Sequence, residues 1–247
     1  MDAPEVSRPD GLVGQRALVT GASRGIGRAI VQRLAAAGMR IAAVARSRDD
    51  LERLARELPG AVVPAPADVR DPAQVAQACD LALAELGGID VLVNNAGLAH
   101  FGLIEELSPE QWDEMFDVNL KGAFLFCRAL VPHMKKRRSG HIINIASVAG
   151  LVTFPRGAGY CASKWGMIAL TETLMQELKP YELKVSVICP GSVKTDFGGT
   201  PPRDYSLRPE DVAAMVATVA AQPQGVILNQ VVMRPLVPQP PQAGAPA

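Results

Sequence analysis

The sequence is short of several features that mark particular classes of protein. Its 25 basic and 25 acidic side chains cancel, and a chain without net charge has no general attraction to nucleic acid or to an anionic membrane surface. No hydrophobic run approaches the length that spans a bilayer. These absences predict a cytoplasmic protein with no nucleic-acid partner and no membrane segment. The chain also has few cysteines, and they are too far apart to suggest a metal site or a disulfide framework: Cys79, Cys127, Cys161 and Cys189.

The composition suits one globular domain. Hydrophobic residues make up 48% of the 247 positions, which is enough to build a full-sized core. We place the domain at residues 14–234. Before it, residues 1–13 form a polar lead-in with acidic, basic and proline residues but no apolar targeting segment. After it, residues 235–247 are rich in proline, glutamine and alanine, a composition that predicts a disordered tail.

A glycine-rich turn lies between two apolar runs near the N-terminus. The first run, at 16–20, is followed by the turn Gly21-Ala22-Ser23-Arg24-Gly25-Ile26-Gly27, an amphipathic stretch, and a second run at 40–45. Strand, helix and strand within about 30 residues form one βαβ unit. Glycines there allow a tight turn, and the N–H groups at the helix start attract a pyrophosphate. Such a turn alone would also suit an ordinary loop, but the βαβ context favours a dinucleotide site.

The end of the second strand bears on the choice of cofactor. An acidic residue at this place binds the free ribose 2′-hydroxyl of NAD, whereas arginine accommodates the 2′-phosphate of NADP. The chain has Arg46 and Arg48 here, and Asp49 and Asp50 come later, where N-capping of the next helix accounts for them. Arg24 in the glycine turn would lie beside the same phosphate. We therefore expect NADP(H), with solvated loop arginines as the alternative interpretation.

Strand and helix patterns alternate along the rest of the chain. Further strands are expected at 61–64, 90–93, 141–146, 184–189 and 225–233. Further helices are expected at 51–57, 72–86, 109–117, 119–136, 158–178 and 209–221. This alternation predicts a parallel sheet covered by helices on both faces. Polar residues that follow the strands, such as Asp68, Asn95 and Ser147, are expected at the ligand-binding edge of that sheet.

Tyr160 and Lys164 are four residues apart, which places both on one face of the predicted helix. A phenol with a pKa near 10 needs its anion favoured by about 4 kcal/mol to act at pH 7. A cation at about 4 Å, at an effective dielectric constant near 20, supplies about that much. The pair is therefore a candidate proton donor and acceptor with an adjacent ammonium, although the spacing alone also arises by chance.

These residues form part of an ordered set of motifs. The motifs are Thr20-Gly21-x-x-x-Gly25-x-Gly27, Asp68, Asn94-Asn95-Ala96-Gly97, Asn119, Ser147, Tyr160-x-x-x-Lys164 and Pro190-Gly191. The motifs occur in the same order as in the short-chain dehydrogenase/reductase family, which the chain resembles over roughly residues 14–232. The resemblance implies an α/β, Rossmann-type, doubly wound fold with a seven-stranded parallel sheet and helices on both faces. It also implies hydride transfer between a nicotinamide and a carbonyl or alcohol.

The resemblance assigns four catalytic residues. Tyr160 would protonate the carbonyl oxygen, and Ser147 would hydrogen-bond that oxygen. Lys164 would lower the pKa of Tyr160 and hold the nicotinamide ribose. Asn119 would hold a water molecule that links Lys164 to solvent, although from the residues alone it is an ordinary helix asparagine.

The resemblance also assigns a cofactor site. Glycine-turn residues would contact the phosphates, and residues after the later strands would contact adenine and its ribose. Val193 and Thr195, after Pro190-Gly191, would contact the nicotinamide carboxamide and the phosphates. The full predicted set is Gly21, Ser23, Arg24, Gly25, Ile26, Gly27, Arg46, Asp68, Val69, Asn95, Ala96, Gly97, Tyr160, Lys164, Pro190, Gly191, Val193 and Thr195.

The chain departs from the family pattern in two places. The connection at 197–208 is short and rich in glycine and proline, where many relatives have a longer helical lid. The last strand lacks the family's glycine pair and continues as Met233-Arg234-Pro235-Leu236, which would change how subunits meet along that edge. Side chains expected near the substrate are His100, Phe101, Val148, Phe154 and Tyr205.

The leading hypothesis is an NADPH-dependent carbonyl reductase that acts on a small ketone, aldehyde or 3-oxoacyl compound. An alcohol dehydrogenase that works in the oxidative direction is the nearest alternative. A nucleotide-binding regulator or scaffold with incidental activity belongs to a different class. By resemblance we expect a homotetramer or homodimer that uses helices 119–136 and 160–178.

Overall fold

A seven-stranded parallel sheet forms the centre of the protein. The computed structural model describes residues 11–195, 197–199 and 205–236, so most of the predicted lead-in and tail lie outside the described residues. The strand order is β3-β2-β1-β4-β5-β6-β7, and every pairing is parallel. The strands are β1 (Arg16–Thr20), β2 (Arg40–Ala45), β3 (Val62–Pro66), β4 (Val91–Asn94), β5 (His141–Ile145), β6 (Lys184–Pro190) and β7 (Gln230–Met233). The predicted Rossmann-type sheet is confirmed.

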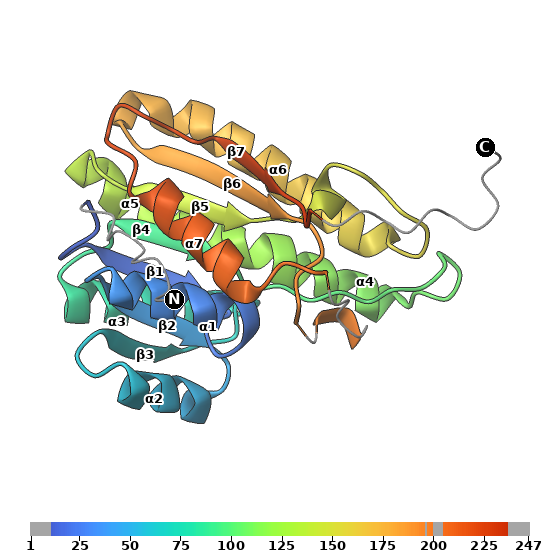
Figure 1. The fold of residues 1–247 in the computed structure, drawn as a ribbon, viewed down its shortest axis with the longest axis horizontal. Coiled ribbons are helices and arrows are strands. Elements are labelled where there is room, and N and C mark those ends of the chain that lie inside the picture. The colour runs from blue at the N-terminus through green and yellow to red at the C-terminus, as the bar shows by residue number, and fades with distance from the viewer. Residues whose placement is uncertain (1–10, 196, 200–204, 237–247) are drawn as a thin grey trace, which may run out of the picture.

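Helices cover both faces of this sheet. Figure 1 views the face on which α1 (Gly25–Ala36) and α7 (Pro209–Ala220) lie against each other in front of the strands. Their apolar side chains share one core cluster with those of α2 (Arg48–Glu57). On the other face, α3 (Pro72–Leu86) and α5 (Gly122–Arg137) form a second cluster, to which the end of α6 (Ala158–Leu178) contributes. Both faces are buried, which is why the central strands read as continuous apolar runs.

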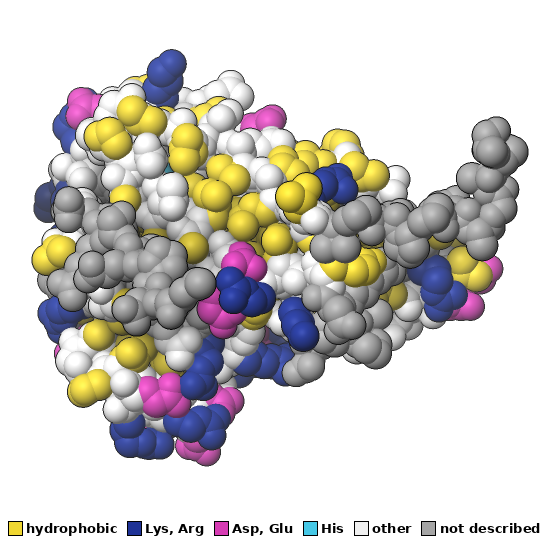
Figure 2. Space-filling model, in the orientation of Figure 1, with side chains coloured by type: hydrophobic (Ala, Val, Ile, Leu, Met, Phe, Trp, Pro, Cys, Tyr) yellow, Lys and Arg dark blue, Asp and Glu magenta, His cyan; other side chains and the backbone are white. Residues whose placement is uncertain are grey.

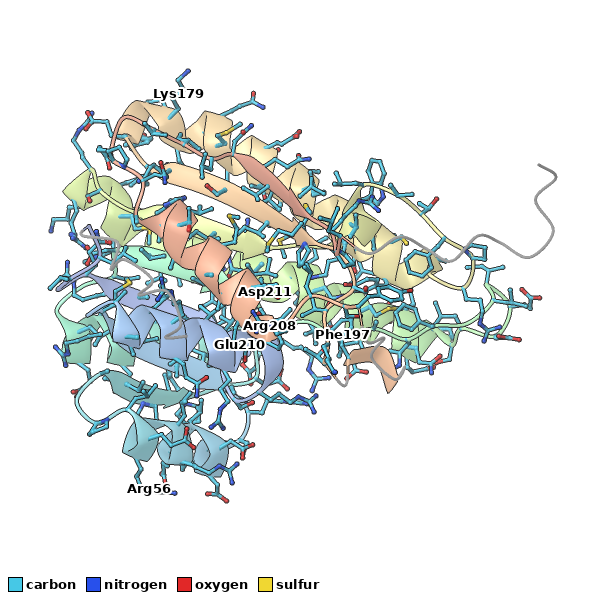
Figure 3. The ribbon with its side chains drawn as sticks, viewed as in Figure 1. Arg56, Lys179, Phe197, Arg208, Glu210 and Asp211 are labelled. Carbon is cyan, nitrogen blue, oxygen red and sulfur yellow. The ribbon has the colours of Figure 1, made fainter. Side chains whose placement is uncertain are left out.

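Several helices begin after a serine or aspartate whose side chain caps the first turn. Ser47 caps α2 by accepting a hydrogen bond from the backbone N of Asp50 at 3.2 Å. The predicted capping role of Asp49 and Asp50 is therefore wrong in detail, because both lie in the first turn, where a negative charge complements the helix dipole. Asp71 caps α3 through the backbone N of Ala73 at 2.8 Å. At α7, Figure 3 shows Arg208 and Asp211 together at the start of the helix.

One predicted break between helices is absent. The sequence predicted separate helices at 109–117 and 119–136, but α4 (Pro109–Phe116) continues into α5 through a π-helical turn at Asp117–Lys121. A π turn widens the helix by one residue and is frequent at functional sites. Here it contains Asn119, whose side chain is buried and hydrogen-bonded, and these contacts compensate for the irregular turn.

The last strand is shorter than predicted. A strand was expected over 225–233, but β7 begins at Gln230 because its backbone joins β6 only from Asn229 onward, where the Asn229 carbonyl accepts from the N of Val187 at 2.8 Å. Three short 3₁₀ turns complete the described structure, at Val148–Gly150, Lys179–Tyr181 and Phe197–Gly199. Among the helices of the described residues, none is both long and apolar enough to span a membrane.

Candidate active site

The carboxyl ends of the strands open into one cleft of about 1060 Å³. The predicted cofactor residues all line it, and so do three of the four predicted catalytic residues, Ser147, Tyr160 and Lys164. Asn119 is the exception, because it lies behind the wall of the cleft. Predicted residues as far apart in the sequence as Gly21 and Thr195 thus meet at one edge of the sheet, as parallel strands require.

The glycine turn packs so tightly that larger residues cannot replace two of its glycines. A Cβ on Gly27 would lie 2.1 Å from the carbonyl oxygen of Gly21. Gly21 itself has φ of 67°, and a Cβ there would lie 2.9 Å from the Nδ2 of Asn95. That Nδ2 donates to the carbonyl of Thr20 at 2.9 Å, which joins the ends of β1 and β4. The turn therefore presents backbone N–H groups at the start of α1 to the cleft, an arrangement that fits a pyrophosphate.

Three arginines line the cleft at the β1, β2 and β3 ends, and only one is neutralised. Arg70 forms an ion pair with Asp68 at 2.6 Å, and its hydrogen bonds lower the pKa of the Asp68 carboxyl. Sequence analysis missed Arg70, although it follows Asp68 by two residues. Arg24 and Arg46 line the same region, and neither has an ion-pair partner among the described residues. Two cations without an ion-pair partner in the described part of the chain are thus available to a phosphate group, although Arg46, after Arg70, also helps to lower the pKa of Asp68.

The chemical centre lies between β5 and α6. Ser147 follows β5 and caps a 3₁₀ turn by accepting from the backbone N of Ala149 at 3.1 Å. Tyr160 and Lys164 lie in the first turns of α6, with exposed fractions of 9% and 3%. The Lys164 Nζ donates to the carbonyl of Ile145 at 3.0 Å, and it lies 5.9 Å from the centroid of the Tyr160 ring. The serine, phenol and ammonium are thus held by neighbouring elements.

Burial dominates the ionisation of this pair. It raises the pKa of Tyr160 to about 12, although a hydrogen bond with Ser147 acts in the opposite direction. The sequence had predicted a lowered pKa. The difference arises because burial removes the hydration of the phenolate, whereas the ammonium of Lys164 donates to the carbonyl of Ile145 and makes no hydrogen bond with the phenol in the described part of the chain. Burial also lowers the pKa of Lys164 to about 8. At neutral pH the tyrosine is therefore protonated and the lysine is mainly an ammonium.

The Asn119 side chain connects the loop after β4 to α6. Its Oδ1 accepts from the backbone N of Leu98 at 2.8 Å, and its Nδ2 donates to the carbonyl of Leu98 at 2.9 Å and to Ser163 Oγ at 3.0 Å. Ser163 in turn donates to the carbonyl of Tyr160 at 2.8 Å. Both amide hydrogens are used, so the side chain has a positioning role in this structure. The predicted water-holding role of Asn119 stays a prediction.

Aromatic rings surround Tyr160 on the substrate side. The centroid of its ring is 5.8 Å from that of Phe101 and 5.6 Å from that of Phe197, and Phe101 is 6.0 Å from Phe154. Each of these phenylalanines is between 37% and 44% exposed, so each presents part of its ring to the cleft. Sequence analysis did not single out Phe197, because only the fold brings residues 197–199 beside Phe101, which a Cβ on Gly198 would touch at 2.5 Å.

The other residues predicted near the substrate have different positions. Val148 lines the main cleft. His100 lines an adjoining pocket of about 610 Å³, and its Nε2 lies 2.9 Å from a carboxylate oxygen of Glu114. Tyr205 lines neither cavity. The segment that precedes it is outside the described residues. Leu207 is hydrogen-bonded to the segment after β6: its N donates to the carbonyl of Ser192 at 2.9 Å, and its carbonyl accepts from the N of Lys194 at 2.7 Å.

The structure adds lining residues that the sequence did not reveal. They include residues from the loops after β4 and β5, from the segment between β6 and α7, and from the end of β7. Among these additions are Leu98, Val152, Thr153, Ser192, Lys194, Ser206 and Arg234. Among the described residues, no cluster of three or more histidine, cysteine or acidic side chains could hold a metal ion.

Comparisons with known proteins agree on one family. A family model described as short chain dehydrogenase matches residues 15–205. The chain is 34% identical over 236 residues to the 3-oxoacyl-[acyl-carrier-protein] reductase FabG of Thermotoga maritima, which covers 90% of this chain and 96% of the relative.

Solved structures give the same result. An alcohol dehydrogenase from the archaeon Thermococcus sibiricus, complexed with 5-hydroxy-NADP, matches with a TM-score of 0.85 and 34% identity over 92% of this chain and 98% of that one. A 3-ketoacyl-(acyl-carrier-protein) reductase from Brucella melitensis, complexed with NADH, matches with a TM-score of 0.85 and 32% identity. This match covers 90% of this chain and 97% of the reductase chain. Nicotinamide cofactors thus occupy both of these related structures.

Proposed function

The chain belongs to the short-chain dehydrogenase/reductase family, and we propose that it reduces a ketone, aldehyde or 3-oxoacyl compound to an alcohol with NADPH as hydride donor. The observation that supports this most directly is the convergence of Ser147, Tyr160 and Lys164 in one cleft beside the glycine turn. The proton-transfer group and the predicted nucleotide site thus face the same space, which supports an enzyme over a regulator that only binds the nucleotide.

The proton chemistry is assigned to residues of this chain. Tyr160 donates its phenolic proton to the carbonyl oxygen, and the hydroxyl of Ser147 donates a hydrogen bond to the same oxygen and orients it. Lys164 is a buried cation that stabilises the phenolate formed as the proton leaves. Asn119 keeps the start of α6 in position through Ser163. The bound reduced nicotinamide supplies the hydride.

Burial keeps Tyr160 in the protonated state from which reduction starts. A phenol with a pKa of about 12 is protonated throughout the neutral range and is therefore ready to donate. Oxidation of an alcohol starts from the phenolate. The same residues catalyse either direction, so the proposed reductive direction rests on the expected use of NADPH as cofactor.

The preference for NADPH is supported by the positive charges in the part of the cleft that follows β1 and β2. Arg24 and Arg46 line it without ion-pair partners among the described residues. Arginine binds phosphate oxygens through charge-assisted hydrogen bonds. Among the described residues that line the cleft, the one carboxylate is Asp68, and it is paired with Arg70. A 2′-phosphate therefore gains contacts here, and a free ribose hydroxyl does not.

The decisive experiment is a rate measurement on the purified protein. Oxidation of NADPH and of NADH is followed against a panel of ketones, aldehydes and 3-oxoacyl thioesters, with Tyr160→Phe alongside the wild type. We expect turnover that prefers NADPH, and a loss of about 100-fold or more in the variant, because it lacks the general acid. Full activity in Tyr160→Phe would overturn the mechanism.

A second tyrosine provides the matched control. Tyr181 lies in the 3₁₀ turn after α6, outside the cleft, with its ring under the ammonium of Lys135. Tyr181→Phe also removes one phenolic hydroxyl and is expected to keep wild-type activity. Equal losses in both variants would point to a general effect on folding. Binding of NADPH, measured by its fluorescence, separates an inactive protein from one that has lost the cofactor site.

A further inference from the structure

Arg234 lies in the cleft because of the way that β7 ends. Met233 is paired with Pro190, and its carbonyl accepts from the backbone N of Gly191 at 2.5 Å. A Cβ on Gly191 would also lie 3.3 Å from the Cδ of Pro235 and 3.3 Å from the Cγ2 of Val148. The segment around Arg234 therefore packs beside the residue that directly follows Ser147. Figure 1 shows this end of β7 near the loop that precedes α6.

The cofactor phosphates do not account for this cation. The glycine turn follows β1 and Arg46 follows β2, whereas Arg234 follows β7 at the opposite edge of the sheet. Strands are about 4.8 Å apart, so five steps from β2 to β7 correspond to roughly 24 Å. The part of the cofactor predicted to lie nearest Arg234 is the nicotinamide, whose carboxamide is neutral. The predicted cofactor and the described residues thus provide no anion for Arg234, whereas a bound substrate could.

No acidic group of the described residues neutralises Arg234. Its guanidinium makes no hydrogen bond or ion pair in this part of the chain, and its side chain is exposed. The described residues that line the cleft include a single carboxylate, Asp68, and it is paired with Arg70 at the β3 end. The walls nearest the chemical centre are instead hydroxyl and apolar groups, such as Ser206, Val148 and Val152. An anion entering here is attracted by Arg234, and no unpaired carboxylate among the described lining residues repels it.

We propose that Arg234 binds an anionic group of the substrate, such as a carboxylate, and thereby selects acidic carbonyl compounds over neutral ones. This inference rests on the proposed carbonyl reductase function. A guanidinium at the rim of the substrate end forms charge-assisted hydrogen bonds with a carboxylate while Ser147 and Tyr160 hold the carbonyl oxygen. The phenylalanine rings around Tyr160 contact the apolar part of the same substrate.

The test compares three keto acids with their neutral counterparts. The probes are 2-, 3- and 4-acetylbenzoate, which place the carboxylate at three distances from the carbonyl, and the methyl ester of each. We measure kcat/KM for NADPH-dependent reduction, and calorimetric binding to protein saturated with NADP⁺. For at least one pair we expect the wild type to favour the acid, and the acid-to-ester ratio to fall about tenfold or more in Arg234→Gln. Arg234→Lys keeps the charge and should retain part of the preference.

Arg56→Gln is the matched control for the loss of one positive charge. Figure 3 shows Arg56 on α2, far from Phe197 at the cleft, so this variant should keep the wild-type ratio. An acid-to-ester ratio that is the same in wild type and Arg234→Gln for all three pairs overturns the inference, as does the failure of every acid to bind. Ester reduction without preference for the acid leaves the proposed function intact. Arg234-dependent binding of an acid without any reduction supports the anion site and contradicts the proposed function.

Discussion

The phenol of Tyr160 and the ammonium of Lys164 lie in the first turns of α6, and burial shifts their pKa values in opposite directions. It disfavours the charged form of each, so the pKa of Tyr160 rises to about 12 while the pKa of Lys164 falls to about 8. The two values leave both side chains protonated at neutral pH. This is the state in which the tyrosine donates a proton and the lysine stabilises the anion that remains. In the proposed reduction, both side chains are therefore in the required state up to the pH at which Lys164 loses its proton.

We accordingly expect a defined pH profile. Lys164 is an ammonium below about pH 8 and neutral above it, so reductive kcat/KM should be constant below pH 8 and fall about tenfold per pH unit above. Initial rates between pH 6 and 10 measure this. The control is Lys184→Met, because Lys184 is also a buried lysine with a lowered pKa but lies outside the cleft. A wild-type profile that stays flat to pH 10 would contradict the assignment.

At the scale of elements, the ends of the strands decide which side chains meet. β1 and β2 place the glycine turn and Arg46 at one end of the cleft, β5 places Ser147 in the middle, and β7 places Arg234 at the other end. Each of these residues follows its strand directly or within two positions. The side chains are exposed to ligand because they come after the last paired residue, where the backbone leaves the sheet.

The end of β2 can be tested for cofactor choice. Arg46→Asp replaces a favourable contact with the 2′-phosphate by a repulsive one, so kcat/KM with NADPH should fall relative to NADH by about tenfold or more. Initial rates with both cofactors give this ratio. Arg48→Asp is the matched control, because Arg48 lies two residues later in α2, outside the cleft, and its Nη1 is 4.0 Å from Glu52. An unchanged ratio in Arg46→Asp would show that the phosphate binds elsewhere.

At the scale of the whole molecule, two of the surfaces that carry exposed apolar side chains are candidate subunit interfaces. Phe124 on α5 and Trp165 on α6 are 47% and 49% exposed, and both belong to the helices predicted to join subunits. Figure 2 shows a second gathering of hydrophobic side chains on the opposite face, toward the edge of the sheet that carries β7, where Val232 is 46% exposed. Large exposed aromatic residues are typical of protein interfaces.

We expect a dimer or tetramer that uses α5 and α6. Light scattering of the wild type should give a mass two or four times that of the chain, and Trp165→Asp should lower it, because a carboxylate cannot be buried unpaired in an apolar interface. Leu81→Asp is the control, since Leu81 is an exposed apolar residue of α3 at 38%. A wild type that is monomeric at working concentration would refute the prediction, and equal masses for Trp165→Asp and wild type would move the interface to another surface.

The sequence by itself determined the features that depend on local pattern. The alternation of apolar runs and amphipathic stretches predicted the parallel sheet and nearly all of its strands, because burial on both faces leaves a continuous apolar signature. The spacing of Gly21, Gly25 and Gly27 predicted a tight turn, and Tyr160 and Lys164 were predicted on one helix because four residues make about one helical turn. The ordered motifs also predicted the family.

Only the tertiary structure decided the features that depend on contacts between distant segments. The π turn at Asp117–Lys121 forms around hydrogen bonds from Asn119 to Leu98 and Ser163, which no local pattern encodes. Burial reversed the predicted shift in the pKa of Tyr160, because the loss of hydration depends on everything packed around the phenol. In the same way, Phe197 and Arg234 enter the cleft only because chain segments far apart in the sequence come together there. Strand order and register are set by long-range packing, and they fix which side chains share a site.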